Sequence, residues 1–183
     1  MLSMGRKHRI CKSKEHRAQR ATSLLRLCKR TTSVSETIRV EIKEEAYLSL
    51  LRYRQYEGFE AGGVFTGSVI GLNQYRISKV SLPCTIIDTA STTGFERDAQ
   101  KANDFIFNDY EASNHTRYYL GEWHTHPESN PTPSFVDINS IEMIYKHSNR
   151  VIDGVFLIIV GIKNNYYGFY DGRMFHKVTV DIV

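Results

Sequence analysis

The chain has 183 residues, of which 41% are hydrophobic and 11% aromatic, so it can bury a core and is neither disordered nor fibrous. Its longest apolar run, residues 155–160, is far shorter than the roughly 20 residues of a membrane-spanning helix. Residues 1–30 carry a net charge of +9 and the remainder −5, so the overall charge of +4 describes a basic arm and is not evidence that the folded part binds nucleic acid.

Residues 1–34 are predicted to form a basic, flexible arm ahead of one compact domain over residues 35–183. Positive charge gives the arm a means of weak contact with nucleic acid or another anionic surface, although it has no aromatic side chain to stack on bases. Its composition also resembles that of a mitochondrial transit peptide, but a solvated arm is the simpler interpretation. Three widely spaced cysteines, Cys11, Cys28 and Cys84, indicate free thiols in a reducing compartment, so we expect a cytoplasmic protein.

Hydrophobic periodicity predicts the elements of the compact domain. Strands are expected over 37–42, 64–70, 75–82, 117–126, 151–162, 166–170 and 173–182, helices over 43–56, 97–112 and 134–147, and a loop over 88–96. A mixed α/β or α+β domain follows, with one central mixed β-sheet flanked by three helices.

The segment GEWHTHPESNPTPSFVD, residues 121–137, contains the residues best suited to chemistry. Side chains two apart on a strand share a face, so His124 and His126 project together and can offer two nitrogens to one metal ion. A His-x-His pair also occurs on surfaces and in cores, so the pair alone leaves both interpretations open. Prolines at 127, 131 and 133 restrict the connection to the following helix.

Ser134 and Asp137 have the spacing of a helix capping box, in which Ser134 accepts an amide hydrogen bond and Asp137 reaches back. A cap and a metal ligand are compatible, because a helix start beside a metal would fix its first-turn side chains. A catalytic base is also needed. Glu60 stands directly before a glycine-rich strand, with Glu57 as an alternative; Glu122 shares strand parity with both histidines and is expected to line the rim of the site.

Glu60, the His124-Thr-His126-Pro run, Ser134 seven residues later and Asp137 together resemble the JAMM signature of the JAB/MPN metalloproteases, and the resemblance covers residues 36–183. It implies a cytidine-deaminase-like sheet with flanking helices, and Zn²⁺ held by His124, His126 and Asp137 with a water at the fourth position. It also implies that Glu60 is the general base and acid and that Ser134 donates to the oxyanion.

Within that family, the run from Gly121 to Glu128 and the PTPS sequence look most like the JAB peptidases of bacterial CBASS antiphage operons. The resemblance implies an isopeptidase that releases a nucleotide cyclase (CD-NTase) conjugated through its C-terminus to a target lysine. Two alternatives stay open: a protease that processes a ubiquitin-like or sulfur-carrier protein, and a non-catalytic MPN scaffold. The intact signature favours an enzyme.

Overall fold

The computed structural model describes residues 37–86, 91, 94 and 96–183, and residues 37–183 form one compact unit. The predicted basic arm and most of the predicted loop over 88–96 lie outside the described residues. Within the described part of the chain, no helix has the length and apolar character needed to span a bilayer.

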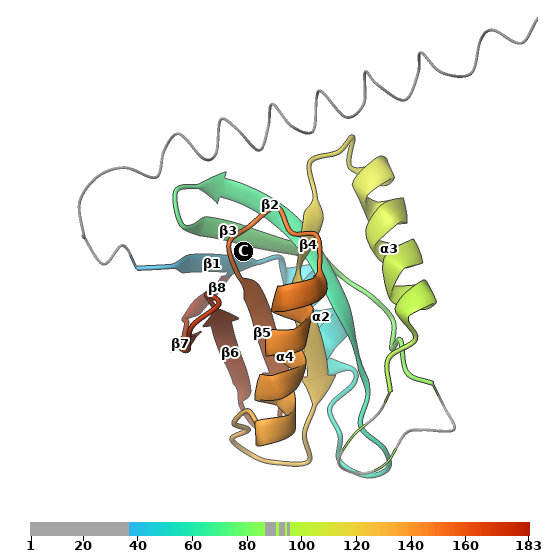
Figure 1. Cartoon of the computed structure of the whole chain (residues 1–183). Helices are drawn as coiled ribbons and strands as arrows, with labels where there is room; N and C mark the ends of the chain where they lie inside the picture. Colours follow the sequence, from blue (N-terminus) through green and yellow to red (C-terminus); the bar gives the residue numbers. More distant parts are fainter. Residues whose placement is uncertain (1–36, 87–90, 92–93, 95) are drawn as a thin grey trace, which may run out of the picture. The chain divides into compact units, whose positions relative to one another are not determined.

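Eight strands and three helices make up the described part of the domain (Figure 1). In chain order they are β1 (Arg39–Ile42), α2 (Glu44–Leu51), β2 (Gly62–Gly71), β3 (Gln74–Val80), α3 (Ala99–Ala112), β4 (Tyr118–Thr125), α4 (Phe135–His147), β5 (Val155–Val160), β6 (Asn165–Tyr170), β7 (Phe175–Lys177) and β8 (Val180–Ile182). A single mixed sheet with three helices is thus confirmed.

The sheet has the strand order β7-β6-β5-β4-β2-β3-β1-β8. Its parallel pairs are β4 with β5, β1 with β3 and β1 with β8, and the other pairs are antiparallel. The two edge strands, β7 and β8, are separated in the chain by only Val178 and Thr179. Because so short a connection spans about 10 Å, the two edges of the sheet must approach each other, and the sheet is strongly curled.

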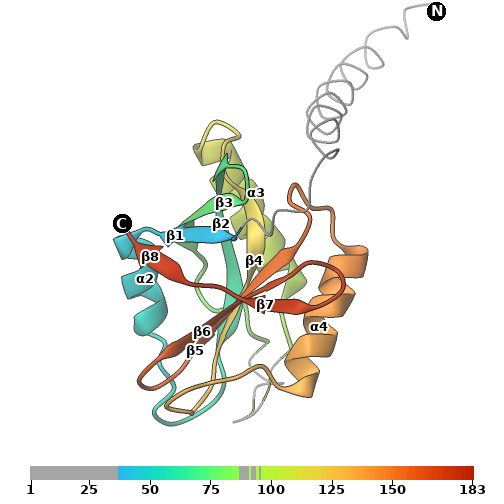
Figure 2. The same cartoon turned by 90° about the vertical axis from the view of Figure 1, so that its left-hand side faces the viewer.

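The helices cover the two faces of this sheet, and strand β5 shows the division most clearly. Its residues Phe156, Ile158 and Val160 share a core cluster with Ala46 and Leu50 of α2. The alternate residues of β5 share a second cluster with Ile141 of α4, and Figure 2 shows α2 and α4 on opposite sides of the sheet. Both faces of β5 are therefore buried, which explains why its sequence, VFLIIV, is continuously apolar.

The strand predicted over 151–162 is shorter in the structure, at Val155–Val160, and two other predicted elements change more. The helix predicted over 43–56 ends at Leu51, and the chain then turns so that Tyr53 stacks on Trp123 with ring centroids 5.0 Å apart. The strand predicted over 173–182 divides into β7 and β8, which pair with opposite edges of the sheet. Both changes come from tertiary packing, which local periodicity does not report.

Helix α3 is fixed to the sheet by a buried carboxylate. Asp109 is 1% exposed and accepts hydrogen bonds from the Thr66 hydroxyl at 2.5 Å and from two guanidinium nitrogens of Arg117 at 2.6 and 2.8 Å. Lys79 lies 3.4 Å away. Burial acts to raise the pKa of Asp109, but the hydrogen bonds and positive charges outweigh it and hold the pKa below its usual value.

Replacing Asp109 by Asn should destabilise the fold by about 3 kcal/mol, because Arg117 loses its buried counter-charge. Since the pKa is depressed in the folded state, the stabilisation is present above the ordinary carboxyl value of about 3.9 and is lost as pH falls through the lower folded pKa. Urea unfolding of the wild-type protein and of Asp109→Asn, from neutral pH to about pH 2, measures the loss of stability and its pH dependence.

The exposed pair of Glu111 and His115 offers a control, because Glu111→Gln should cost under about 1 kcal/mol. Equal losses for the two variants would contradict the role assigned to Asp109.

Candidate metal centre

Two histidines project from the end of β4 onto the face of the sheet that α4 covers. His124 pairs with Gly62 of β2 and with Ile159 of β5, and the His126 amide donates to Val160 just beyond the strand end. Both side chains are 10% exposed, and their Nε2 atoms lie 3.1 Å apart. The shared face expected from the His-x-His spacing is therefore present.

The first turn of α4 adds a carboxylate. Ser134 is the N-cap and forms the capping box: its amide donates to Asp137 Oδ2 at 2.7 Å, and its hydroxyl accepts from the Asp137 amide at 3.2 Å. This pair of bonds orients Asp137 so that Oδ1 lies 3.3 Å from His124 Nε2 and Oδ2 lies 3.5 Å from His126 Nε2. The same carboxylate thus completes the cap and faces both imidazoles.

The three donor groups fit a tetrahedral metal ion. Ligands about 2.0–2.1 Å from a central zinc lie roughly 3.3–3.4 Å from one another. The separations among His124, His126 and Asp137 run from 3.1 to 3.5 Å, close to those edges. Among the residues that the structure describes, none is a hydrogen-bond partner of the buried His126 Nδ1, so none of them fixes the tautomer of this ring.

The electrostatics of the cluster favour an ionised Asp137 and a neutral His124. Burial alone would raise the pKa of Asp137, but the two imidazoles and Ser134 hold that pKa well below its usual range. Burial lowers the pKa of His124, which favours the neutral imidazole that binds metals. Burial likewise opposes protonation of His126, but Asp137, Glu60 and Glu128 outweigh it and raise the pKa of that ring.

Glu60 lies beside the cluster at the end of the loop that leads into β2. Its Oε1 is 3.5 Å from His126 Nε2, and the side chain is 8% exposed. Burial raises the pKa of Glu60 to about 7, against the opposing effect of His126. Glu57, the alternative base, is exposed.

Thr125, the residue between the two histidines, anchors this loop from the opposite face of β4. Its hydroxyl accepts from the Ala61 amide at 3.0 Å and donates to Gln55 Oε1 at 3.2 Å, while its own amide donates to the Ala61 carbonyl at 2.9 Å. In β2, two residues after Ala61, Gly63 packs so closely that a Cβ there would collide with the Ser81 hydroxyl. The His-Thr-His run therefore presents two rings on one face and positions Glu60 from the other.

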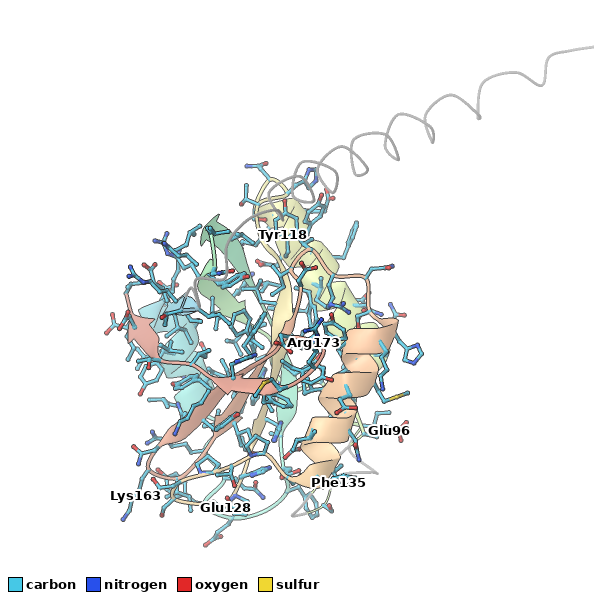
Figure 3. The ribbon with its side chains drawn as sticks, turned by 60° about the vertical axis from the view of Figure 1, so that its left-hand side comes forward. Glu96, Tyr118, Glu128, Phe135, Lys163 and Arg173 are labelled. Atoms are coloured by element: carbon cyan, nitrogen blue, oxygen red, sulfur yellow. The ribbon has the colours of Figure 1, made fainter. Side chains whose placement is uncertain are left out.

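A cavity of about 560 Å³ joins these groups. Its lining includes all five residues that the sequence singled out, namely Glu60, His124, His126, Ser134 and Asp137. Figure 3 shows Glu128 and Phe135, which flank the Pro-rich connection, at one end of the molecule, with Tyr118 at the other. The strand end, the connection and the helix start thus meet at a single end of the fold.

A further polar group consists of Glu122, Tyr119 and Arg97. Of these three residues, the sequence predicted only Glu122 to lie at the site. Glu122, two residues before His124, is 3% exposed; it accepts from the Tyr119 hydroxyl at 2.5 Å and lies 2.6 Å from Arg97 Nη2. Burial raises the pKa of Glu122 despite Arg97. Strand parity placed Glu122 on the correct face, but nothing local in the sequence connects it to Arg97, which comes from the segment before α3.

The chain is similar in sequence to proteins of a known family. Residues 45–170 match the family model described as prokaryotic homologs of the JAB domain. A CD-NTase/cGAS isopeptidase from Escherichia coli (strain TW11681) is 38% identical over 135 residues, which cover 70% of this chain and 80% of the relative. A protein of the same name from Pseudomonas aeruginosa is 41% identical over 78 residues, covering 43% of this chain and 48% of the relative.

The solution structure of a Desulfitobacterium hafniense protein superposes with a TM-score of 0.58 at 16% identity, covering 79% of this chain and 92% of that one. This likeness concerns the fold alone and agrees with the curled mixed sheet. Because the family model spans most of the compact domain and the Escherichia coli relative is matched over most of its length, the chain belongs to the prokaryotic JAB-domain family.

Proposed function

We propose that this protein is a zinc-dependent isopeptidase that releases a protein conjugated through its C-terminus to a lysine, the conjugated protein being a CD-NTase in antiphage defence. The observation that carries the proposal is the convergence of His124, His126 and Asp137, with Glu60 beside them, in one open cavity. Family membership and the isopeptidase names of the two relatives support the same reaction class.

His124, His126 and Asp137 are the residues that would hold the ion, and the cavity that they line would give water and substrate access to it. When bound there, zinc supplies Lewis-acid chemistry, acidifying a water and polarising the scissile carbonyl. Glu60 would accept the proton of the attacking water and return a proton to the departing lysine amine. Its pKa of about 7 suits both transfers, because a group that must gain and lose a proton works best near the ambient pH.

Ser134 would stabilise the negative charge that develops on the scissile oxygen. Its hydroxyl oxygen already accepts from the Asp137 amide, and a hydroxyl that accepts still has one hydrogen to donate. Since the side chain lines the cavity beside the metal ligands, that hydrogen can point toward the reacting carbonyl. The capping bond fixes the oxygen in place before the substrate arrives.

Replacing Glu60 by Gln should lower the turnover of a lysine-linked conjugate by about 10²–10⁴-fold, because the amide has no proton-accepting oxygen of carboxylate strength. Zinc content, measured by mass spectrometry of the purified protein, should stay near one ion per chain. Glu57→Gln is the matched control: Glu57 is exposed in the same loop, and that variant should retain wild-type turnover. A Glu60→Gln protein that cleaves at the wild-type rate would remove Glu60 from the mechanism.

Removal of the metal should abolish cleavage reversibly. A chelator should extract zinc from the wild-type protein and stop turnover, and added Zn²⁺ should restore it. His124→Ala, His126→Ala and Asp137→Ala should each fail to retain zinc, because two remaining ligands bind the ion weakly. Full cleavage by chelated protein shown to be free of zinc would contradict a metal mechanism; zinc bound without any turnover would favour a scaffold.

Ser134→Ala should produce two separable effects. Loss of the cap should cost about 1 kcal/mol of unfolding free energy, and loss of the oxyanion donor should lower kcat by roughly 10²–10³-fold. Ser134→Gly retains much of the N-cap preference while lacking the hydroxyl, so it should recover stability without recovering kcat. Melting curves and kcat, measured on all three proteins, provide the comparison. If kcat recovers together with stability in Ser134→Gly, the serine acts only as a cap.

A further inference from the structure

The cavity extends well beyond the metal ligands. Three aliphatic side chains, Ile141 and Ile144 of α4 and Leu157 of β5, line it together with Glu122 and Arg97. Leu157 pairs directly with Glu122 in the sheet, two residues back along the strands from His124. Two residues of strand span about 7 Å, so this inner part lies one or two substrate residues away from the metal ligands.

The polar side of the inner cavity presents little net charge. Arg97 Nη2 lies 2.6 Å from Glu122 Oε2, and the Tyr119 hydroxyl donates to the other oxygen of the same carboxylate. One positive and one negative group therefore balance each other. Beyond Glu60 and Asp137, the other carboxylates that line the cavity, Glu96 and Glu128, are exposed to solvent.

Ile141 and Leu157 are only 2% and 1% exposed and form the floor of this part of the cavity, so the partly buried Ile144 supplies its accessible aliphatic surface. An extended chain with glycine at every position near the cleaved bond would leave Ile144 uncovered. A volume of about 560 Å³ lies within the range of roughly 300–1,000 Å³ typical of pockets that enclose ligands. Burial of an aliphatic side chain against Ile144 removes apolar surface of both groups from water and favours binding. The balanced Arg97 and Glu122 pair gives no corresponding advantage to a charged side chain.

Building on the proposed isopeptidase function, we propose that this inner cavity is a specificity subsite. It binds an aliphatic side chain carried by one of the last three residues of the conjugated tail. The enzyme therefore prefers tails with a leucine-like residue at that position over tails that end only in glycines. Ile144 is the determinant best placed for testing, because it lines the cavity and is only partly buried.

The test uses a panel of lysine-linked isopeptides that differ only in one residue, Gly, Leu, Arg or Asp, at each of the last three tail positions. At one position, Leu should raise kcat/KM of the zinc-loaded protein at least tenfold over Gly, as expected for filling an apolar pocket. Ile144→Trp should reduce this Leu-to-Gly ratio to near one, and Ile144→Ala should shift the preference toward a larger residue such as Phe.

Met143 provides the matched control for these variants. It neighbours Ile144 on α4, is 54% exposed and does not line the cavity, so Met143→Trp should keep the wild-type Leu-to-Gly ratio. The subsite is excluded if Gly or Arg equals or exceeds Leu at all three positions. It is also excluded if the two tryptophan variants change the ratio equally.

Binding separates this inference from the proposed reaction. Fluorescence anisotropy of the same peptides with the zinc-loaded Glu60→Gln protein reports subsite occupancy without turnover. Tighter binding of the Leu peptide, with no cleavage of any peptide by the wild-type protein, would support the subsite and contradict the isopeptidase. Cleavage of the peptides by the wild-type protein without any preference for Leu would support the isopeptidase and contradict the subsite.

Discussion

Two imidazole nitrogens and a carboxylate meet within 3.5 Å of one another at a largely buried end of the sheet, and this convergence requires a positive charge at its centre. Lone pairs brought this close repel unless a proton or a metal ion lies between them, and a carboxylate removed from water needs a counter-charge. A shared proton can serve only one of the three contacts at a time, whereas a divalent ion serves all three. We therefore regard the proposed zinc site as the feature on which the proposed function depends.

The fold brings the three groups together with elements that are stable for other reasons. Strand β4 is the central strand between β2 and β5, so the end that carries His124 is held from both sides. The capping box fixes Asp137 within the first turn of α4, where the helix dipole also favours a negative charge. Thr125 holds the Glu60 loop from the opposite face. Because strand pairing fixes the backbone of the two histidines and the capping box orients Asp137, the proposed metal binding would need little backbone reorganisation.

Local sequence patterns predicted most of these parts but not their assembly. Strand parity placed His124 and His126 on one face, and the Ser134 and Asp137 spacing predicted the capping box that the structure contains. That the end of β4 meets the start of α4 could be expected only from the resemblance to a family. The early end of α2 and the link from Arg97 to Glu122 depend on contacts between distant segments, which no local periodicity encodes.

The measurement that tests the central claim most directly is X-ray absorption at the zinc edge on the zinc-loaded, full-length protein. We expect one ion per chain with a first shell of nitrogen and oxygen at about 2.0–2.1 Å and scattering from two imidazole rings, because His124 and His126 both direct Nε2 toward Asp137. The His124→Ala protein, if any zinc remains, should show a single ring. A wild-type spectrum with only oxygen ligands, or with ring scattering unchanged in His124→Ala, would contradict the site described here.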